Sequence, residues 1–156
     1  MSSTPSKRRP WGLSDPVRNA LLPLLVSVTI YMLFRSKAFA VIHLFHLDCA
    51  KESLTNLQLF CQPLKALLPA WILYSLPDGL WTYAFTAYFV CRLRNDPPST
   101  MKVCYLLLTP TLSITFETAQ YFHLLPGTFD LTDLALNCAG ALLPFLLFHP
   151  GFFAKV

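Results

Sequence analysis

The segment of this 156-residue chain that decides the fold runs from Phe116 to Gly140 and reads FETAQYFHLLPGTFDLTDLALNCAG. Two apolar stretches flank a short turn at Pro126-Gly127. A charged side chain at the centre of a bilayer costs about 2.5–3.5 kcal/mol, so such residues usually face the interior of a helical bundle and serve a function. The segment therefore predicts a pair of membrane helices with a polar site, formed by the carboxylate or amide side chains of Glu117, Gln120, Asp130, Asp133 and Asn137.

The composition extends this prediction to the whole chain. Hydrophobic residues make up 54% of the sequence and charged residues 13%, which is unusual for a soluble domain. A membrane span needs about 20 largely apolar residues. We therefore expect an all-α integral membrane protein, a single domain over residues 1–156 with a polar cytoplasmic tail at 1–15 and an outer loop at 38–65. The four expected spans are 17–37, 66–91, 103–122 and 131–148.

The basic residues predict the orientation. Positive charge concentrates on the cytoplasmic side of membrane proteins. With both termini inside, eight Lys and Arg residues lie inside and four outside, and the turn at Gly127 carries none. The net charge of +4 is then explained by topology, and no nucleic-acid partner is expected. The inner set is Lys7, Arg8, Arg9, Arg18, Arg92, Arg94, Lys102 and Lys155, and the outer set is Arg35, Lys37, Lys51 and Lys65.

The outer loop at 38–65 begins with an apolar stretch, 39–47, that we expect to lie partly in the membrane interface. His43 and His46 lie three residues apart in it, but their spacing matches no established zinc pattern. We therefore expect neither a metal nor a cofactor. Cys49 and Cys61 would face an oxidising compartment, and the sequence leaves open whether they pair.

Residue spacing predicts that the polar side chains meet. A short connection makes the two last spans an antiparallel hairpin. Glu117 and Asn137 each lie ten residues from Gly127, so they should lie at the same depth, as should Gln120 and Asp133. With a rise of about 1.5 Å per residue, Asp78 of the second span reaches a similar level, about 21 Å above Arg92.

Structural roles explain part of this pattern equally well. Asp130 is a candidate N-cap for the last span, with Asp133 in its first turn, where the helix dipole favours negative charge. Asn137 and Gln120 are candidates for hydrogen bonds between helices, and Asp78 is a candidate for bonding backbone groups freed by Pro77. Glu117 lies more than a turn inside its span, so capping does not explain it.

The arrangement of these residues resembles the VanZ-like family of small bacterial membrane proteins. The matching motif is Glu117-x-x-Gln120, a Pro-Gly turn, then Asp130-x-x-Asp133-x-x-x-Asn137-x-x-Gly140, and the resemblance covers about Glu117–Gly140. The basic residue that the family usually carries in the turn is absent here. The resemblance implies an integral protein of the bacterial inner membrane. The founding member of the family is associated with resistance to glycopeptide antibiotics of the teicoplanin type.

The sequence therefore predicts a VanZ-like envelope protein that binds or shields an amphiphilic ligand or a lipid-linked precursor in an outward-facing polar pocket. Two alternatives stay open. One is a membrane-embedded enzyme in which Glu117 and Asp78 act as acid and base. The other is a structural subunit that packs against a larger membrane-protein partner. No nucleophile-and-base pattern is found in the sequence, which favours binding over catalysis.

Overall fold

The computed structural model describes residues 14–35, 51–93, 96–97, 99–125 and 129–148. The described residues form helices and contain no strand, so the prediction of an all-α fold is confirmed for them. Four helices are long, and two short helices, α3 and α4, connect the first long helix to the second. The helices are α1 (Ser14–Phe34), α3 (Lys51–Phe60), α4 (Gln62–Leu67), α5 (Ala70–Leu93), α6 (Thr100–Tyr121) and α7 (Leu131–Phe148).

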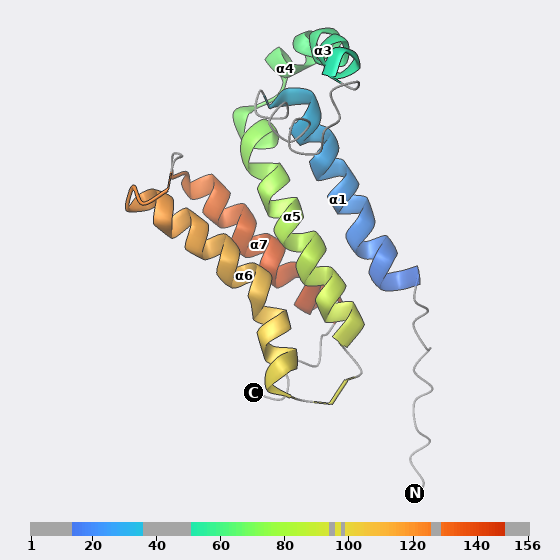
Figure 1. Ribbon diagram of the computed structural model, residues 1–156, viewed down its shortest axis with the longest axis vertical. Helices are drawn as coiled ribbons and strands as arrows, with labels where there is room; N and C mark the ends of the chain where they lie inside the picture. The colour runs from blue at the N-terminus through green and yellow to red at the C-terminus, as the bar shows by residue number, and fades with distance from the viewer. Residues whose placement is uncertain (1–13, 36–50, 94–95, 98, 126–128, 149–156) are drawn as a thin grey trace, which may run out of the picture.

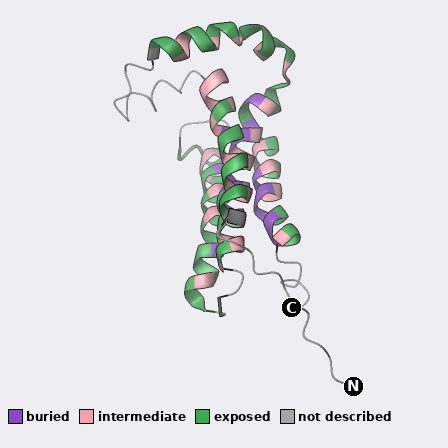
Figure 2. Cartoon of the chain, turned by 90° about the vertical axis from the view of Figure 1, so that its right-hand side faces the viewer, coloured by how far each residue is buried: buried purple, intermediate pink, exposed green. Residues whose placement is uncertain are grey.

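Helix α5 is the centre of the bundle. It packs extensively against α7 on one side and α1 on the other, whereas α6 makes a smaller contact with α5 and α7 (Figure 1). The four long helices alternate in direction, so that the start of α1 and the end of α7 lie at the same end of the bundle. Helices α3 and α4 lie across the opposite end and are largely exposed (Figure 2).

Two glycines explain why α5 and α7 approach so closely. A β-carbon added at Gly79 would lie 2.9 Å from Leu136 Cβ and 3.0 Å from the Leu136 carbonyl oxygen. A β-carbon added at Gly140 would collide with the Gly79 carbonyl oxygen and lie 3.0 Å from the Tyr83 amide nitrogen. Small residues of this kind allow helix backbones to touch, as is common between membrane helices. This contact fixes the position of α7 and of the polar residues that it carries.

The end of α6 is closed by backbone hydrogen bonds. The Leu124 amide donates to the Ala119 carbonyl at 2.8 Å and the His123 amide to the Gln120 carbonyl at 3.0 Å. This is the Schellman pattern, whose C′ residue adopts a left-handed conformation and is usually glycine. Here it is His123, with φ of 56°. The chain therefore reverses toward α7 through a conformation that a side chain disfavours.

We expect His123→Gly to stabilise the protein. Glycine adopts positive φ without the steric cost that a β-carbon brings, and the gain should be about 1 kcal/mol in the free energy of unfolding. Reversible unfolding of the purified protein in mixed micelles measures it. His123→Ala is the control, because it removes the imidazole and keeps the β-carbon. Equal stability of the two variants would contradict this account of the helix end.

The long helices coincide closely with the apolar segments of the sequence. Among the described residues, Val17–Phe34 and Leu131–Phe148 are long and apolar enough to cross a membrane. By the same measure of length and hydropathy, α5 and α6 are not apolar enough to count as candidate membrane spans. The expected outer loop differs from the structure, because its second half forms α3 and α4. Its apolar start at 39–47, with His43, His46 and Cys49, lies outside the described residues.

Candidate functional site

Glu117 is the most unusual side chain of the bundle. Only two residues of α6 are buried, Leu106 and Glu117, and the residue Glu117 is 6% exposed. Its Oε2 atom is buried and makes no hydrogen bond to any described residue. Buried carboxylates normally have hydrogen-bond or charged partners, because an unpaired buried charge is costly. Glu117 is therefore the first candidate for a functional side chain on α6.

Three further carboxylates lie within electrostatic range of Glu117. They come from Asp133 and Asp130 at the start of α7 and Asp78 on α5, and Asp133 acts on Glu117 most strongly. Asp133 Oδ1 is also buried and without a hydrogen-bond partner among the described residues. We call Asp78, Glu117, Asp130 and Asp133 the acidic cluster. It gathers negative charge from three helices around two carboxylate oxygens that lack donors.

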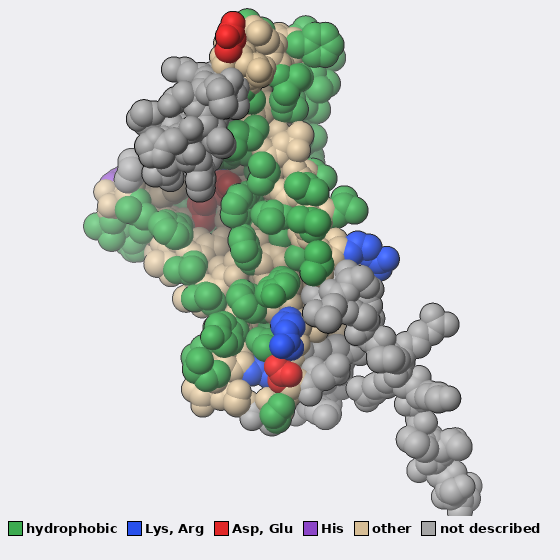
Figure 3. Space-filling model, turned by 45° about the vertical axis from the view of Figure 1, so that its right-hand side comes forward, with side chains coloured by type: hydrophobic (Ala, Val, Ile, Leu, Met, Phe, Trp, Pro, Cys, Tyr) green, Lys and Arg blue, Asp and Glu red, His purple; other side chains and the backbone are tan. Residues whose placement is uncertain are grey.

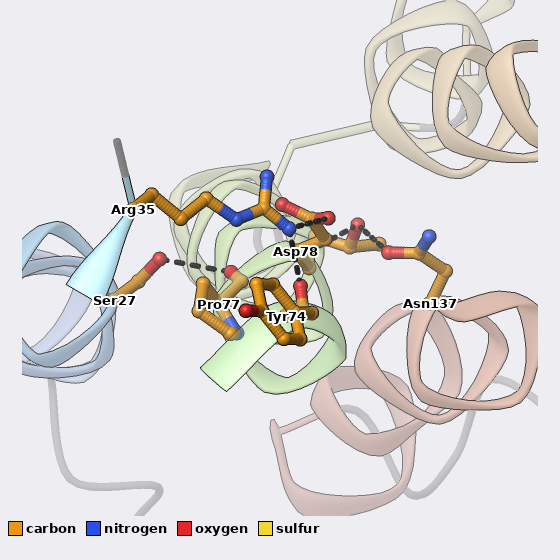
Figure 4. A network of polar contacts seen from close by, with 7 residues as sticks. Ser27, Arg35, Tyr74, Pro77, Asp78 and Asn137 are labelled. Atoms are coloured by element: carbon orange, nitrogen blue, oxygen red, sulfur yellow. Dashed lines mark hydrogen bonds and ion pairs between the residues drawn. The ribbon is translucent and has the colours of Figure 1, made fainter. Parts of the chain in front are cut away.

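Asp78 is the member of the acidic cluster that faces a cation. Its Oδ2 lies 3.4 Å from Nη2 of Arg35, the residue that follows α1 (Figure 4). The same Nη2 donates to the main-chain oxygen of Tyr74 at 2.6 Å. The guanidinium also lies over the rings of Tyr31 and Tyr74, 5.4 and 5.9 Å from their centroids, which adds cation–π attraction. Arg35 thus links the end of α1 to α5 and offsets the charge of Asp78.

Ser27 strengthens the same link between α1 and α5. Its buried hydroxyl donates to the Pro77 carbonyl oxygen at 2.8 Å (Figure 4). Pro77 directly precedes Asp78 in the chain, so Ser27 and Arg35 both attach α1 to α5 close to that carboxylate. The side chain of Asp78 therefore bonds to Arg35 and not, among the described residues, to the backbone groups that Pro77 frees.

Asn137 belongs to a neutral network beneath the carboxylates. It is 4% exposed, and its Oδ1 accepts a hydrogen bond of 2.9 Å from Thr82 Oγ1 on α5. Thr82 Oγ1 also lies 3.2 Å from Ser113 Oγ on α6 and 3.1 Å from the Asp78 carbonyl oxygen. The network therefore joins α5, α6 and α7. Asn137 holds helices together, as the structural interpretation of the sequence proposed for it.

Asp130 is the N-cap of α7. Its Oδ1 accepts a 2.8 Å hydrogen bond from the Thr132 amide, and its main-chain oxygen accepts from the Leu134 amide. Asp133 lies in the first turn, where the helix dipole favours a carboxylate. Gln120 is half-buried near the end of α6. The facing pairs expected across the hairpin, Glu117 with Asn137 and Gln120 with Asp133, stay predictions.

The chemistry available at the site is that of acceptors. Carboxylate oxygens without donors can receive hydrogen bonds from an ammonium or hydroxyl group, or they can exchange protons. Within the described ranges, no group of three or more His, Cys, Asp or Glu residues is arranged to hold a metal ion. The site therefore offers carboxylate oxygens as acceptors.

Several residues of the site do not stand out in the sequence. Arg35 reads as one of four outer basic residues, and Thr82, Ser113 and Ser27 are hydroxyl residues of a common kind in apolar helices. Near Thr82, the sequence indicates the site through Gly79, which predicts a close contact between helices there. Arg35 was therefore missed as the partner of Asp78, while the shared depth expected for Asp78, Glu117 and Asn137 stays a prediction.

Comparison with known proteins identifies the family. A family model described as VanZ/LLP1 matches residues 2–154. No curated protein and no solved structure matches the chain significantly. The match is much longer than the Glu117–Gly140 motif, so the resemblance extends over α1 and α5 as well as the hairpin. Because the family model covers nearly the whole sequence, this chain belongs to the VanZ/LLP1 family.

Proposed function

We propose that the protein is a four-span membrane protein of the bacterial envelope, resident in the inner membrane, which binds the cationic group of an amphiphilic ligand or lipid-linked precursor in the acidic cluster. The observation that carries this proposal is the buried Glu117, whose Oε2 lacks a donor. Membership in the VanZ/LLP1 family supports a role at the envelope.

The distribution of side chains supports placement in a membrane. Large hydrophobic residues are exposed along α1, α6 and α7, and they cover much of the face drawn in Figure 3. The buried residues include six polar or charged ones: Ser27, Ser75, Thr82, Thr86, Glu117 and Asn137. A soluble protein rarely exposes apolar patches larger than a few hundred Å². Apolar surfaces outside and hydroxyl, amide and small residues between helices are expected of a bundle in lipid.

The proposed topology has both termini in the cytoplasm and the α6–α7 turn outside. We expect an impermeant thiol reagent added to intact cells to label Leu125→Cys and not Thr100→Cys, in a background without the five native cysteines. Both positions are exposed and lie at opposite ends of α6. Labelling of both after permeabilisation is the control. Labelling of Thr100→Cys alone in intact cells would show that the orientation is the opposite of the one proposed.

The charge of the acidic cluster supports a cationic ligand. Of its four carboxylates, Asp78 is paired with Arg35, and Asp130 and Asp133 benefit from the start of α7. Glu117 has no such compensation among the described residues. Repulsion between like charges is strong where the dielectric constant is low, so a bound ammonium group would relieve it. The exposed apolar helices beside the cluster offer a lipid-like surface for the tail of the ligand.

The experiment is equilibrium binding to the purified protein in lipid nanodiscs. The probe is a dansyl-labelled long-chain primary amine, and the matched control is the same probe with its amine acetylated. We expect the amine probe to bind saturably, and we expect the acetylated probe not to displace it. Equal binding of the two probes would remove the charge-based argument for a ligand at Glu117.

The same residues favour one alternative. Glu117 and Asp133 each have a buried oxygen without a donor, and a pair of carboxyl groups in a dry site suits proton transfer. A membrane-embedded acid–base enzyme would use Glu117 with Asp133 or Asp78. Binding without turnover of the probe or of candidate lipid precursors favours the ligand-binding proposal, and turnover lost in Glu117→Gln favours the enzyme.

A further inference from the structure

A polar cavity lies at the end of the bundle covered by α3 and α4. It has a volume of about 110 Å³ and is lined by Leu33, Phe34, Arg35, Gln58, Gln62 and Lys65. A cavity needs only about 10–15 Å³ of such space to hold one water molecule, so this one has room for a small polyatomic group. Its polar lining consists of two cations and two amides, which is the opposite character to the acidic cluster.

The donors that line this cavity are incompletely used. Both side-chain bonds of Arg35 that the structure shows are made by Nη2, and its Nε is buried without a partner among the described residues. Gln58 Nε2 donates to the Met32 carbonyl oxygen at 2.7 Å, which fixes α3 against α1. The side chains of Lys65 and Gln62 make no hydrogen bond or ion pair within the described part of the chain. The cavity thus contains several N–H donors and no carboxylate.

We propose that this cavity binds a single phosphate group, held by Arg35 and Lys65 and oriented by the side-chain amides of Gln58 and Gln62. Guanidinium and ammonium groups are the usual protein ligands of phosphate oxygens, and a phosphate oxygen would give the buried Nε of Arg35 its missing acceptor. The group is larger than a water molecule and small enough for the cavity. Arg35 also contacts Asp78 of the acidic cluster, whereas Lys65, Gln58 and Gln62 lie outside that cluster.

The place of the cavity suggests where the phosphate comes from. Arg35 follows the end of α1, and α3 and α4 lie across that end of the bundle (Figures 1 and 2). The two short helices expose Leu59, Phe60 and Leu67, which suits a segment resting in the membrane interface. Phospholipid phosphates lie at this level. A lipid headgroup and a soluble phosphate share the same chemistry, so the test must separate them.

The test is calorimetric titration of the full-length protein in non-ionic detergent. The ligands are dihexanoyl phosphatidic acid, dihexanoylglycerol (which lacks the phosphate) and inorganic phosphate. We expect the phosphatidic acid to bind at least about tenfold more tightly than dihexanoylglycerol. Lys65→Gln should weaken it about fivefold, the loss expected for one basic residue at a membrane surface. Lys65→Arg should restore binding, because it restores the charge.

Lys102→Gln is the matched control. Lys102 is half-buried, as Lys65 is, but its Nζ donates to the main-chain oxygen of Asp96 and it lies at the opposite end of the bundle. If inorganic phosphate displaces phosphatidic acid at concentrations similar to those of the lipid, the site is supported and its ligand is soluble phosphate. If inorganic phosphate competes only weakly, the ligand is the lipid headgroup. Equal affinities for phosphatidic acid and dihexanoylglycerol, or unchanged affinity in Lys65→Gln, would overturn the proposal. Binding of the amine probe should not change in Lys65→Gln.

Discussion

Gly140→Ala is expected to destabilise the protein by about 3 kcal/mol, the upper part of the range for overpacked interiors. The added β-carbon would meet the Gly79 carbonyl oxygen and the Tyr83 amide nitrogen, and both belong to the backbone of α5. No rotamer change relieves such a collision. In an unobstructed helix, the same exchange stabilises by about 1 kcal/mol, so the expected sign opposes helix propensity.

The consequence of Gly140→Ala should reach the site. Moving α7 away from α5 would lengthen the Thr82–Asn137 hydrogen bond and displace Asp133 from Glu117. We therefore expect loss of amine-probe binding together with lower stability, measured by unfolding in mixed micelles. Ala135→Val is the control, because it enlarges an exposed position of the same helix. A Gly140→Ala protein as stable as the native one would show that α5 and α7 are not in this contact.

The sequence predicted the helices well because their signals are local. Apolar runs of about 20 residues and the Pro-Gly turn define elements whatever packs against them. It also predicts a similar depth for Asp78, Glu117 and Asn137, because the rise per residue fixes the height of each side chain along its helix. The close contact of α5 and α7 follows from Gly79 and Gly140, where a β-carbon would have no room.

The residues that contact one another at a given depth could not be predicted in the same way. Height along a helix says nothing of rotation about its axis or of which neighbour a helix chooses. The facing of Asn137 and Glu117 across the hairpin stays a prediction, whereas the hydrogen bond between Asn137 and Thr82 was not anticipated and follows from the packing of α7 mainly on α5. Arg35 was expected to be one of the basic residues on the outer side of the membrane. It also contacts Asp78, because α1 packs beside α5. Such choices depend on the whole bundle.

Glu117→Gln should abolish binding of the amine probe while preserving the fold. An amide of the same shape keeps hydrogen-bonding capacity and loses the charge that the ligand is proposed to meet. Truncating one partner of a buried charge pair costs about 2–5 kcal/mol or more, so we expect affinity to fall at least about 30-fold. The free energy of unfolding should stay equal or rise, because the variant no longer buries a charge without a partner.

Two further variants separate a binding role from a structural one. Asp133→Asn removes the charge that acts most strongly on Glu117 and should also weaken the amine probe, with a double mutant less affected than the sum of the singles. Asp96→Asn, an exposed carboxylate at the other end of the bundle, should change nothing. If Glu117 only holds helices together, then Glu117→Gln should bind the probe as the native protein does. That result would leave the acidic cluster as a packing feature of the bundle. Among its four carboxylates, only Glu117 at once lies in the interior of a helix, is fully buried and has an oxygen without a hydrogen bond to the described residues.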